Sequence, residues 1–281
     1  MTRPKITFAT CVDYPDLTED DRLTVAELAR VGIDVVPWVW DRAAESETDL
    51  VIVRSCWDYH RKTAEFTAWL KAGHNLLNPA SVALWNLNKR YLAELEAWGQ
   101  PVPRTLWIDA GAKVDLAATL EQHAFQEVVV KPVVGMLGID TFRVSRETAH
   151  ERQGDVDRIL AERGIMIQEF VSSVLTEGEV SLVFIDSDFS HALRKRPRHG
   201  EFRIHEEYGG TREVFRPAES MVRQGQELLS HLPALLYARV DGIPRDGQLV
   251  LMELELIDPH LFLAYDNNAP RRFAEAIAAR V

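Results

Sequence analysis

The segment at residues 248–259 constrains the fold more strongly than any other part of the chain. Its sequence is QLVLMELELIDP, which predicts a strand. Side chains two positions apart in a strand share a face, so Glu253 and Glu255 point the same way, while apolar residues fill the other face. Asp241 ends the preceding predicted strand, residues 235–240. Such carboxylates are typical either of a solvated face or of a Mg²⁺ site, where substrate phosphates usually bind too.

The size and charge of the chain exclude several classes of protein. Its 281 residues are enough for one large or two modest domains with a sizeable core. Hydrophobic residues make up 46% and charged residues 27%, as in an ordinary globular enzyme. The net charge of -11 argues against general binding to nucleic acid or to anionic membranes, because such proteins are usually basic. Any anion site must therefore depend on a local cluster of cations.

The cysteine content and the hydropathy pattern favour a cytoplasmic protein. Cys11 and Cys56 are the only cysteines, and neither lies in a CxxC motif, so neither a disulfide framework nor a structural zinc site is expected. No segment has the roughly 18 consecutive apolar residues of a membrane span. The first residues, MTRPK, lack the apolar stretch of a signal peptide.

The first part of the chain alternates strands with helices, which predicts a parallel α/β unit. The expected strands are residues 5–10, 33–37, 49–53 and 75–77, and the expected helices are residues 18–30 and 61–71. Ligands of such units bind beyond the carboxyl ends of the strands, where the loops at residues 11–16 and 54–59 lie. The second loop therefore faces a substrate or is simply a tight turn around a packed Trp57.

A hairpin with a lysine is predicted in the middle of the chain. The strand at residues 127–132 carries Lys131, the loop that follows contains Gly135 and Gly138, and a second strand covers residues 141–144. The tip could lie over phosphates with Lys131 as a point charge, although two glycines in a hairpin are often only a turn. Neither a Walker loop nor the GxGxxG fingerprint of dinucleotide-binding proteins is present.

The second half of the chain supplies more helices and cations. Lys195 lies between two arginines, and this cluster of cations is either a local anion site or a solvated strand end. Arg203 is a further candidate for binding an anion. A helix is expected at residues 155–163, capped by Asp155, and a strand at residues 165–171. Further helices are expected at residues 219–231 and from Asn267 or Asn268 to Ala279.

Taken in order, these segments resemble the ATP-grasp superfamily of carboxylate–amine ligases over nearly the whole chain. The resemblance rests on Lys89 before a helix, VKP at 130–132, QEF at 168–170, GE at 178–179, FR at 202–203, GG at 209–210, RVD at 239–241 and ELE at 253–255. The chain looks like the glutathione synthetase and RimK-type branch. Residues 54–59 and 253–259 are similar to the cycloserine synthetase (O-ureido-serine cyclo-ligase) group.

The resemblance implies an α/β fold of three parts. An N-terminal parallel α/β domain would cover residues 1–85. Two α+β ATP-grasp subdomains would follow: a central lid with its entry helix at residues 86–171, and a C-terminal subdomain with the Mg²⁺ site at residues 172–281. Closure of the lid would keep water from the reaction.

The resemblance also implies binding of ATP and two Mg²⁺ ions. Lys89 and Lys131 would bind the phosphates beneath the loop of Gly135 and Gly138. The hinge Gln168, Glu169, Phe170 and Val171 would hold adenine, and Glu177 or Glu179 the ribose. Lys195 and Arg203 would face the γ-phosphate and the acyl-phosphate, and Asp241, Glu253 and Glu255 would hold Mg²⁺. The loop at residues 133–139 is poorer in glycine and serine than in many relatives. Many relatives have Asn at the position of Glu255, so the implied metal site of this chain is more anionic than theirs.

The acceptor would lie between the first domain and the C-terminal part. The implied substrate residues are Tyr14, Arg54, Trp57, Asp58, Tyr59, His205, Gly209 and Gly210. Arg54 could hold a carboxylate and Asp58 an ammonium, which points to an amino-acid-like small molecule. We therefore expect Arg54→Ala to weaken acceptor binding without changing ATP affinity. Relatives are often dimers or tetramers, so a homo-oligomer is expected by analogy.

The function implied is an ATP-dependent ligase that makes an amide, or closes an amide-like ring, through an acyl-phosphate. One alternative within the fold is a phosphotransferase, whose phosphate would stay on the product. Another is a regulatory nucleotide-binding module without turnover, although such modules tend to lose metal ligands that are intact here. A dehydrogenase is disfavoured by the missing glycine fingerprint.

Overall fold

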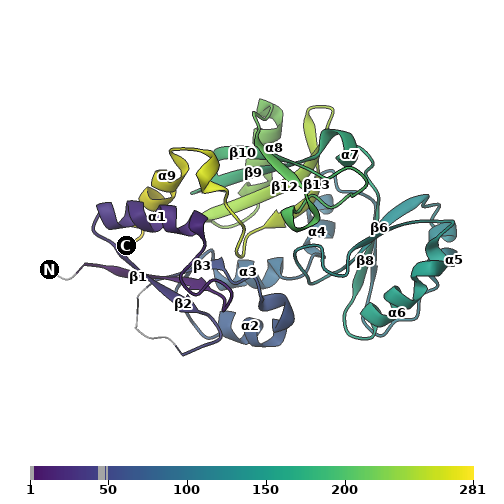
Figure 1. Ribbon diagram of the computed structural model, residues 1–281, viewed down its shortest axis with the longest axis horizontal. Helices are drawn as coiled ribbons and strands as arrows, with labels where there is room; N and C mark the ends of the chain where they lie inside the picture. Colours follow the sequence, from purple (N-terminus) through teal and green to yellow (C-terminus); the bar gives the residue numbers. More distant parts are fainter. Residues whose placement is uncertain (1–2, 44–47, 49) are drawn as a thin grey trace.

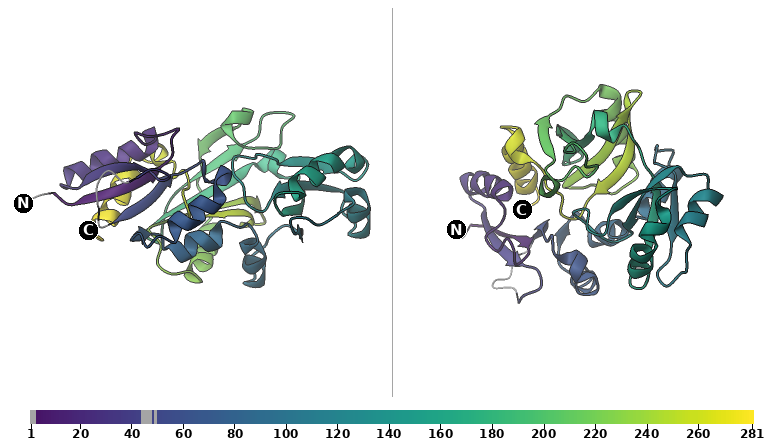
Figure 2. Two further views of the ribbon diagram at one scale, coloured as in Figure 1. Left: turned by 90° about the horizontal axis from the view of Figure 1, so that it is seen from below. Right: turned by 45° about the vertical axis from the view of Figure 1, so that its right-hand side comes forward.

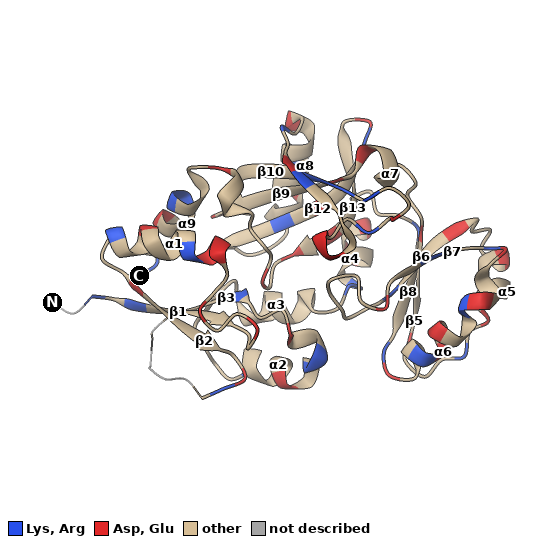
Figure 3. Cartoon of the chain, in the orientation of Figure 1, with Lys and Arg blue, Asp and Glu red and all other residues tan. Residues whose placement is uncertain are grey.

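The computed structural model describes residues 3–43, 48 and 50–281, which form three lobes, each built on one sheet (Figure 1). The N-terminal lobe and the middle lobe lie at opposite ends of the molecule, and the C-terminal lobe lies between them (Figures 1 and 2). Both signs of charge occur on all three lobes (Figure 3). Among the described residues no helix is long and apolar enough to cross a membrane.

The N-terminal lobe is the parallel α/β unit that the sequence predicts. Its sheet has the order β2-β1-β3-β4, and every neighbouring pair is parallel. Asp49, the first residue of one predicted strand, lies outside the described residues. Helix α3, which the sequence analysis did not predict, follows Pro79. The elements are β1 (Lys5–Thr10), α1 (Glu19–Arg30), β2 (Asp34–Val39), β3 (Val51–Ser55), a 3-10 turn (Tyr59–Arg61), α2 (Thr63–Leu70), β4 (Leu76–Leu77) and α3 (Ala80–Asn86).

The middle lobe carries an antiparallel sheet of order β5-β8-β6-β7. The predicted cap at Asp155 is wrong: a 3-10 turn runs directly into α6, so the helix begins earlier and Asp155 lies in its first turn. The elements are α4 (Tyr91–Ala97), β5 (Thr105–Ile108), α5 (Leu116–Gln122), β6 (Glu127–Pro132), β7 (Phe142–Ser145), a 3-10 turn (Ala149–Arg152), α6 (Gln153–Leu160) and β8 (Ile165–Glu169).

The C-terminal lobe is a five-stranded antiparallel sheet of order β11-β10-β9-β12-β13. Its elements are α7 (Val174–Glu177), β9 (Glu179–Ile185), β10 (Asp188–Arg196), a 3-10 turn (Glu206–Tyr208), β11 (Thr211–Val214), α8 (Glu219–Ser230), β12 (Tyr237–Arg245), β13 (Gln248–Glu255), a 3-10 turn (Leu263–Tyr265) and α9 (Ala269–Ala278).

Asp241 does not end its strand, contrary to the sequence prediction. Strand β12 runs on to Arg245, and its register against β13 shifts between Asp241 and Gly242. Glycine is needed at the shift, because a Cβ on Gly242 would lie 2.8 Å from the Cβ of Leu249. The irregularity therefore lies directly after Asp241 and affects the direction in which its carboxylate points.

The last helix returns to the first lobe. Helix α9 packs beside α1, and Phe273 and Ile277 share one buried core with Ile6 and Leu28 (Figures 1 and 2). The buried core of the middle lobe, by contrast, draws only on residues 116–167. The N-terminal and C-terminal lobes thus form a continuous body, to which the middle lobe is attached. The domain boundaries at residues 85 and 171 stay a prediction.

Candidate active site

A cavity of about 660 Å³ is lined by residues from all three lobes. The N-terminal lobe contributes Tyr14 and Trp57, and the hairpin of β6 and β7 contributes Lys131. Strands β12 and β13 contribute Asp241 and Glu253. Residues that are distant in the sequence therefore meet around one space, whose floor is the acidic part of the C-terminal sheet.

The outer edge of β13 is held by side chains of the N-terminal region. The side-chain amide of Asn86 donates to the carbonyl of Leu254 (2.8 Å) and accepts from the N–H of Leu256 (2.9 Å). Asn78 donates to the carbonyl of Leu256 (2.8 Å), and the hydroxyl of Tyr91 accepts from the N–H of Leu254 (3.0 Å). An exposed strand edge would leave these backbone groups unpaired. These contacts fix the position of the acidic strand.

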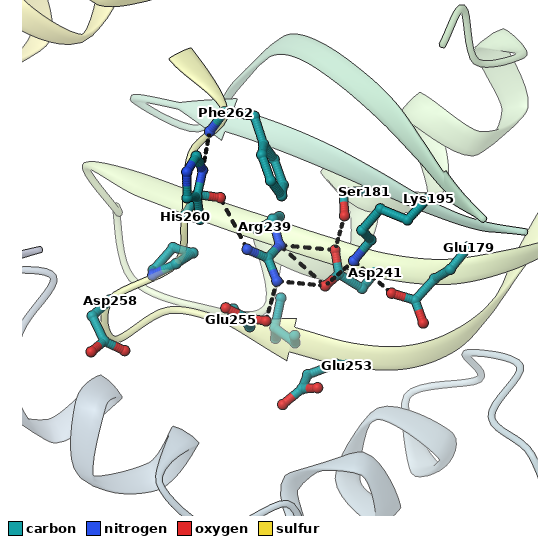
Figure 4. A network of polar contacts seen from close by, with 12 residues as sticks. Glu179, Ser181, Lys195, Arg239, Asp241, Glu253, Glu255, Asp258, His260 and Phe262 are labelled. Atoms are coloured by element: carbon teal, nitrogen blue, oxygen red, sulfur yellow. Dashed lines mark hydrogen bonds and ion pairs between the residues drawn. The ribbon is translucent and has the colours of Figure 1, made fainter. Parts of the chain in front are cut away.

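Arg239 lies at the centre of an ion-pair network on the cavity face of β12 and β13 (Figure 4). Its guanidinium donates to Asp241 (2.8 Å) and to Glu255, its cross-strand neighbour. Lys195 lies 3.3 Å from the carboxylate of Asp241 and 2.7 Å from that of Glu179. Although burial opposes it, Arg239 and Lys195 hold the pKa of Asp241 well below its usual range. Burial raises the pKa of Glu255 to about 7.

Two lysines face Glu253, which lies opposite Asp241 in the neighbouring strand. Lys89 forms an ion pair with Glu253. Although burial opposes it, Lys89 and Lys131 lower the pKa of Glu253. Burial lowers the pKa of Lys131 to about 8. Lys131 makes no ion pair with the described residues, so its charge is available to a ligand.

The carboxylates suit Mg²⁺ in their chemistry but are bound to cations of the chain. Asp241, Glu253 and Glu255 offer only oxygen ligands and all line the cavity. Each is paired with Arg239 or Lys89, and within the described part of the chain no three His, Cys, Asp or Glu side chains approach closely enough to form a metal site. Binding of the metal therefore requires these ion pairs to rearrange.

The predicted nucleotide contacts lie along another wall of the same cavity. Its lining includes Gly135, Gly138, Gln168, Glu169, Phe170 and Val171. The side chain of Gln168 is buried, and its Oε1 has no hydrogen-bond partner among the described residues. Gly138 has a φ of +67°, and a Cβ there would lie 3.3 Å from the side chain of Arg203. The glycine loop and Arg203 therefore meet in the wall of the cavity.

The structure separates the two candidates for ribose and places two of the substrate candidates outside the cavity lining. Glu179 lines the cavity, whereas Glu177 is exposed on α7 and does not. His205, Trp57 and Tyr59 line it, but Gly209 and Gly210 do not. Gly210 has a structural role, because a Cβ there would lie 2.2 Å from the carbonyl oxygen of Ile204.

Arg54 and Asp58 lie outside the cavity lining. The Nε of Arg54 donates to Asp21 (2.8 Å), and both side chains are only 2% exposed. Its Nη2 donates to the carbonyl of Pro259 (3.2 Å), and its Nη1 has no hydrogen-bond partner among the described residues. Asp58 accepts a hydrogen bond from the indole N–H of Trp40 (2.7 Å). These contacts give both residues a structural role, and their contact with a substrate stays a prediction.

We expect Arg54→Met to destabilise the fold by about 3 kcal/mol, because it leaves the carboxylate of Asp21 buried without its partner. Urea unfolding would measure the loss. The double substitution Asp21→Asn with Arg54→Met removes both charges and should recover part of the lost stability. If Arg54→Met folded normally and only weakened acceptor binding, the structural role would be contradicted.

Several residues of the site were missed in the sequence. Arg239 was noted only as part of a motif, although its position two residues before Asp241 puts both on one face of β12. Asp20 and Asp258 also line the cavity. For Asp20 the sequence gave a misleading signal, since an acidic residue in the first turn of a helix is usually explained by the helix dipole.

The fold and the cavity together define an ATP-dependent ligase of the ATP-grasp type, and comparisons with known proteins agree. Residues 98–240 match the family described as the ATP-grasp domain of prokaryotic glutathione synthetase. Residues 6–78 match the N-terminal domain of D-cycloserine synthetase DcsG. The chain belongs to the ATP-grasp ligases.

Within that family the chain is similar to a cycloserine enzyme. The cycloserine biosynthesis protein DcsG of Streptomyces lavendulae is 32% identical, over 96% of this chain and 94% of that protein. The crystal structure of D-cycloserine synthetase DcsG matches with a TM-score of 0.86 and 28% identity, covering 98% of this chain and 99% of that one. An ATP-complexed D-alanine–D-alanine ligase from Bacillus anthracis shares the fold, with a TM-score of 0.69 and 15% identity over 98% of this chain and 96% of that one.

Proposed function

We propose that the protein activates the carboxylate of an amino-acid-like small molecule as an acyl-phosphate, which a nitrogen nucleophile of the same or a second molecule then attacks. The observation that carries the proposal is one cavity lined by Lys89, Lys131, Asp241, Glu253 and Glu255 together with the hinge at the end of β8. Phosphoryl transfer depends mainly on positioning and on neutralising charge, which these residues are suited to do.

Within this proposal each wall of the cavity has one task. Gln168, Glu169, Phe170 and Val171 hold adenine, and the ribose falls to Glu179 rather than to the exposed Glu177. Lys89 and Lys131 bind the phosphates. Lys195, Arg203 and Arg239 stabilise the charge on the transferred phosphoryl group and on the acyl-phosphate. The middle lobe closes over the cavity and excludes water, which would hydrolyse that intermediate.

Asp241, Glu253 and Glu255 would hold Mg²⁺, with two ions as the expected number. The metal supplies charge neutralisation between carboxylates and phosphates. Arg239 and Lys89 keep these carboxylates from repelling one another until nucleotide and metal arrive. With Mg²⁺ held by these carboxylates, Arg239 and Lys89 would be free to bind phosphate oxygens.

Charge on Lys131 should make nucleotide binding dependent on pH. With its pKa lowered to about 8 by burial, Lys131 loses its proton as the pH rises through that value, and a phosphate ligand favours the protonated form. Affinity for a non-hydrolysable ATP analogue should fall by up to about tenfold per pH unit above this value. Calorimetry between pH 7 and pH 9.5 would measure it. Lys131→Arg, which stays charged, should flatten the profile, whereas a flat profile for the wild type would contradict the assignment.

The similarity to cycloserine synthetase supports ring closure on an O-ureido-serine as the first reaction to examine. Three measurements test the proposed function: calorimetric binding of the ATP analogue with and without Mg²⁺, release of ADP with O-ureido-D-serine and O-ureido-L-serine, and release of phosphate. ADP and phosphate in equal amounts are expected for a ligase. ADP without free phosphate would identify a phosphotransferase, and Mg²⁺-dependent binding without turnover of any amino acid would favour a regulatory module.

Two broader expectations belong to the same proposal. We infer a cytoplasmic location, which agrees with the buried free thiols of Cys11 and Cys56. We also infer a dimer or tetramer, by analogy with related ligases. Sedimentation or light scattering of the purified protein would measure its oligomeric state.

A further inference from the structure

A buried carboxylate at the N-terminal side of the cavity has an oxygen without a partner. Asp20 lies in the first turn of α1, is 7% exposed and lines the cavity. Its Oδ1 accepts a hydrogen bond from the N–H of Ala264 (3.0 Å). Its Oδ2 has no hydrogen-bond partner within the described part of the chain. A buried carboxylate oxygen left in this state is costly unless a cation or a donor reaches it.

His260 is the nearest titratable neighbour, yet it cannot serve as that partner. Its Nδ1 lies 3.6 Å from Oδ2 of Asp20. The same Nδ1 accepts the N–H of Phe262 (3.0 Å), so it has no proton to offer. Burial and the charge of Arg212 lower the pKa of His260 to about 3, which keeps the ring neutral. Two acceptor atoms therefore face each other with no donor between them.

Arg54 does not serve as that partner either. Burial raises the pKa of Asp20, and the charge of Arg54 acts in the opposite direction. Arg54 donates through Nε to Asp21 (2.8 Å) and through Nη2 to the carbonyl of Pro259 (3.2 Å), whereas its Nη1 has no hydrogen-bond partner among the described residues and so does not bind Asp20.

Aromatic rings also line this side of the cavity: Trp57 stacks on His260 with centroids 6.0 Å apart, and Tyr14 meets Trp57 edge-on at 5.2 Å. A negative oxygen beside aromatic rings is the surrounding that a substrate ammonium group prefers.

We propose that Asp20 binds the α-ammonium group of the substrate and thereby selects α-amino acids over molecules that lack the amino group. This inference rests on the proposed ligase function for the identity of the cavity. The carboxylate to be activated then faces Arg239, whose Nη1 donates to the main-chain carbonyl of His260 (3.0 Å). Asp20 lies beside the ring of His260 and Arg239 binds its main-chain carbonyl, so the two charged groups flank the same residue. This arrangement suits a small molecule that carries both an ammonium and a carboxylate.

The geometry assigns to Asp20 the role that the loop sequence offered to Asp58. Asp58 is bound to Trp40 and is absent from the cavity lining, whereas Asp20 lines it with one free acceptor. Asp258 also lines the cavity and has a buried carboxylate oxygen without a hydrogen-bond partner among the described residues, and it lies close enough to Glu255 for the two charges to interact. It is therefore the comparison site in the experiment.

Asp20→Asn is the decisive variant, because an asparagine keeps an oxygen for the N–H of Ala264 but loses the charge. Asp16→Asn is the matched control, since Asp16 is an exposed acid before the same helix. The probes are O-ureido-D-serine, O-ureido-L-serine, D-serine and L-serine, each paired with its counterpart in which a hydroxyl replaces the amino group. Calorimetry in the presence of the ATP analogue and Mg²⁺ measures binding, and ADP release is recorded separately.

Wild type and Asp16→Asn should bind at least one amino compound about 10 to 100 times more tightly than its hydroxy counterpart. Asp20→Asn should lose that preference while its affinity for the ATP analogue and for the hydroxy compound stays the same. Equal weakening of both compounds would reveal a merely structural role and overturn the proposal. Loss of the preference in Asp258→Asn but not in Asp20→Asn, or no preference in the wild type, would also overturn it.

The same experiment separates this inference from the proposed function. A preference that depends on Asp20 without release of ADP would support the ammonium site and contradict the ligase reaction. Release of ADP with the hydroxy compounds at the rate of the amino compounds would support the ligase reaction and overturn the ammonium site.

Discussion

Glu253→Gln is expected to reduce ADP formation by at least about 10³-fold, the largest loss among the substitutions considered. Glutamine keeps the size of the side chain and its place on β13 but removes the charge that lies between Lys89 and Asp241, the proposed metal ligand. Two lysines then face the cavity without their counter-ion, and the metal loses a ligand. Calorimetry should show that binding of the ATP analogue no longer depends on Mg²⁺.

The control for this substitution is Glu219→Gln, because the side chain of Glu219 is 93% exposed on α8. It should leave both turnover and Mg²⁺ dependence unchanged. If Glu253→Gln kept the Mg²⁺ dependence of the wild type, the metal would have to be bound elsewhere, and the assignment of β13 as the metal-binding strand would be contradicted.

Arg239→Met is expected to damage both the reaction and the fold. Removal of the guanidinium leaves Asp241, which is 2% exposed, beside Glu255 without the cation that joins them. Breaking a buried pair from one side costs about 3–5 kcal/mol, and the lower end applies here because Glu255 is partly exposed. Turnover should fall by about 10³-fold, since the charge that faces the acyl-phosphate is also lost. Urea unfolding and ADP release measure the two effects.

Mg²⁺ offers a way to separate these two effects. In its presence the metal replaces part of the missing positive charge, so stability should recover while turnover does not. Arg239→Lys should retain more stability than Arg239→Met but remain slow, because an ammonium lacks the planar fork of donors with which the guanidinium binds Asp241 and Glu255. Recovery of turnover by Mg²⁺ alone would contradict a catalytic role for Arg239.

The acidic strand and the lysine hairpin could be predicted because their signals are local. Alternation along β13 places Glu253 and Glu255 on one face, and this follows from two-residue periodicity alone. Lys131 follows a run of valines and precedes a glycine-containing loop, which the hairpin of β6 and β7 confirms. Resemblance to the ATP-grasp ligases then supplied the order of the segments, and the comparisons confirm the fold and the family.

The substrate side could not be predicted in the same way because its contacts join distant parts of the chain. Arg54 pairs with Asp21, 33 positions earlier, and its guanidinium lies over the ring of Tyr237, near the other end of the chain. Helix α3 was missed although its Asn86 holds the edge of β13, 168 positions away. No local pattern distinguishes a buried structural arginine from one that binds a ligand; only its partners do.

The return of α9 to α1 has a consequence for how the chain folds during synthesis. The core around Ile6 and Leu28 is completed by Phe273 and Ile277, which emerge from the ribosome after the rest of this core. Part of the apolar surface of the first sheet therefore stays uncovered until α9 has been translated, whereas the middle lobe has the residues of its own buried core much earlier. The nascent protein thus acquires its lysine hairpin before its N-terminal lobe is complete.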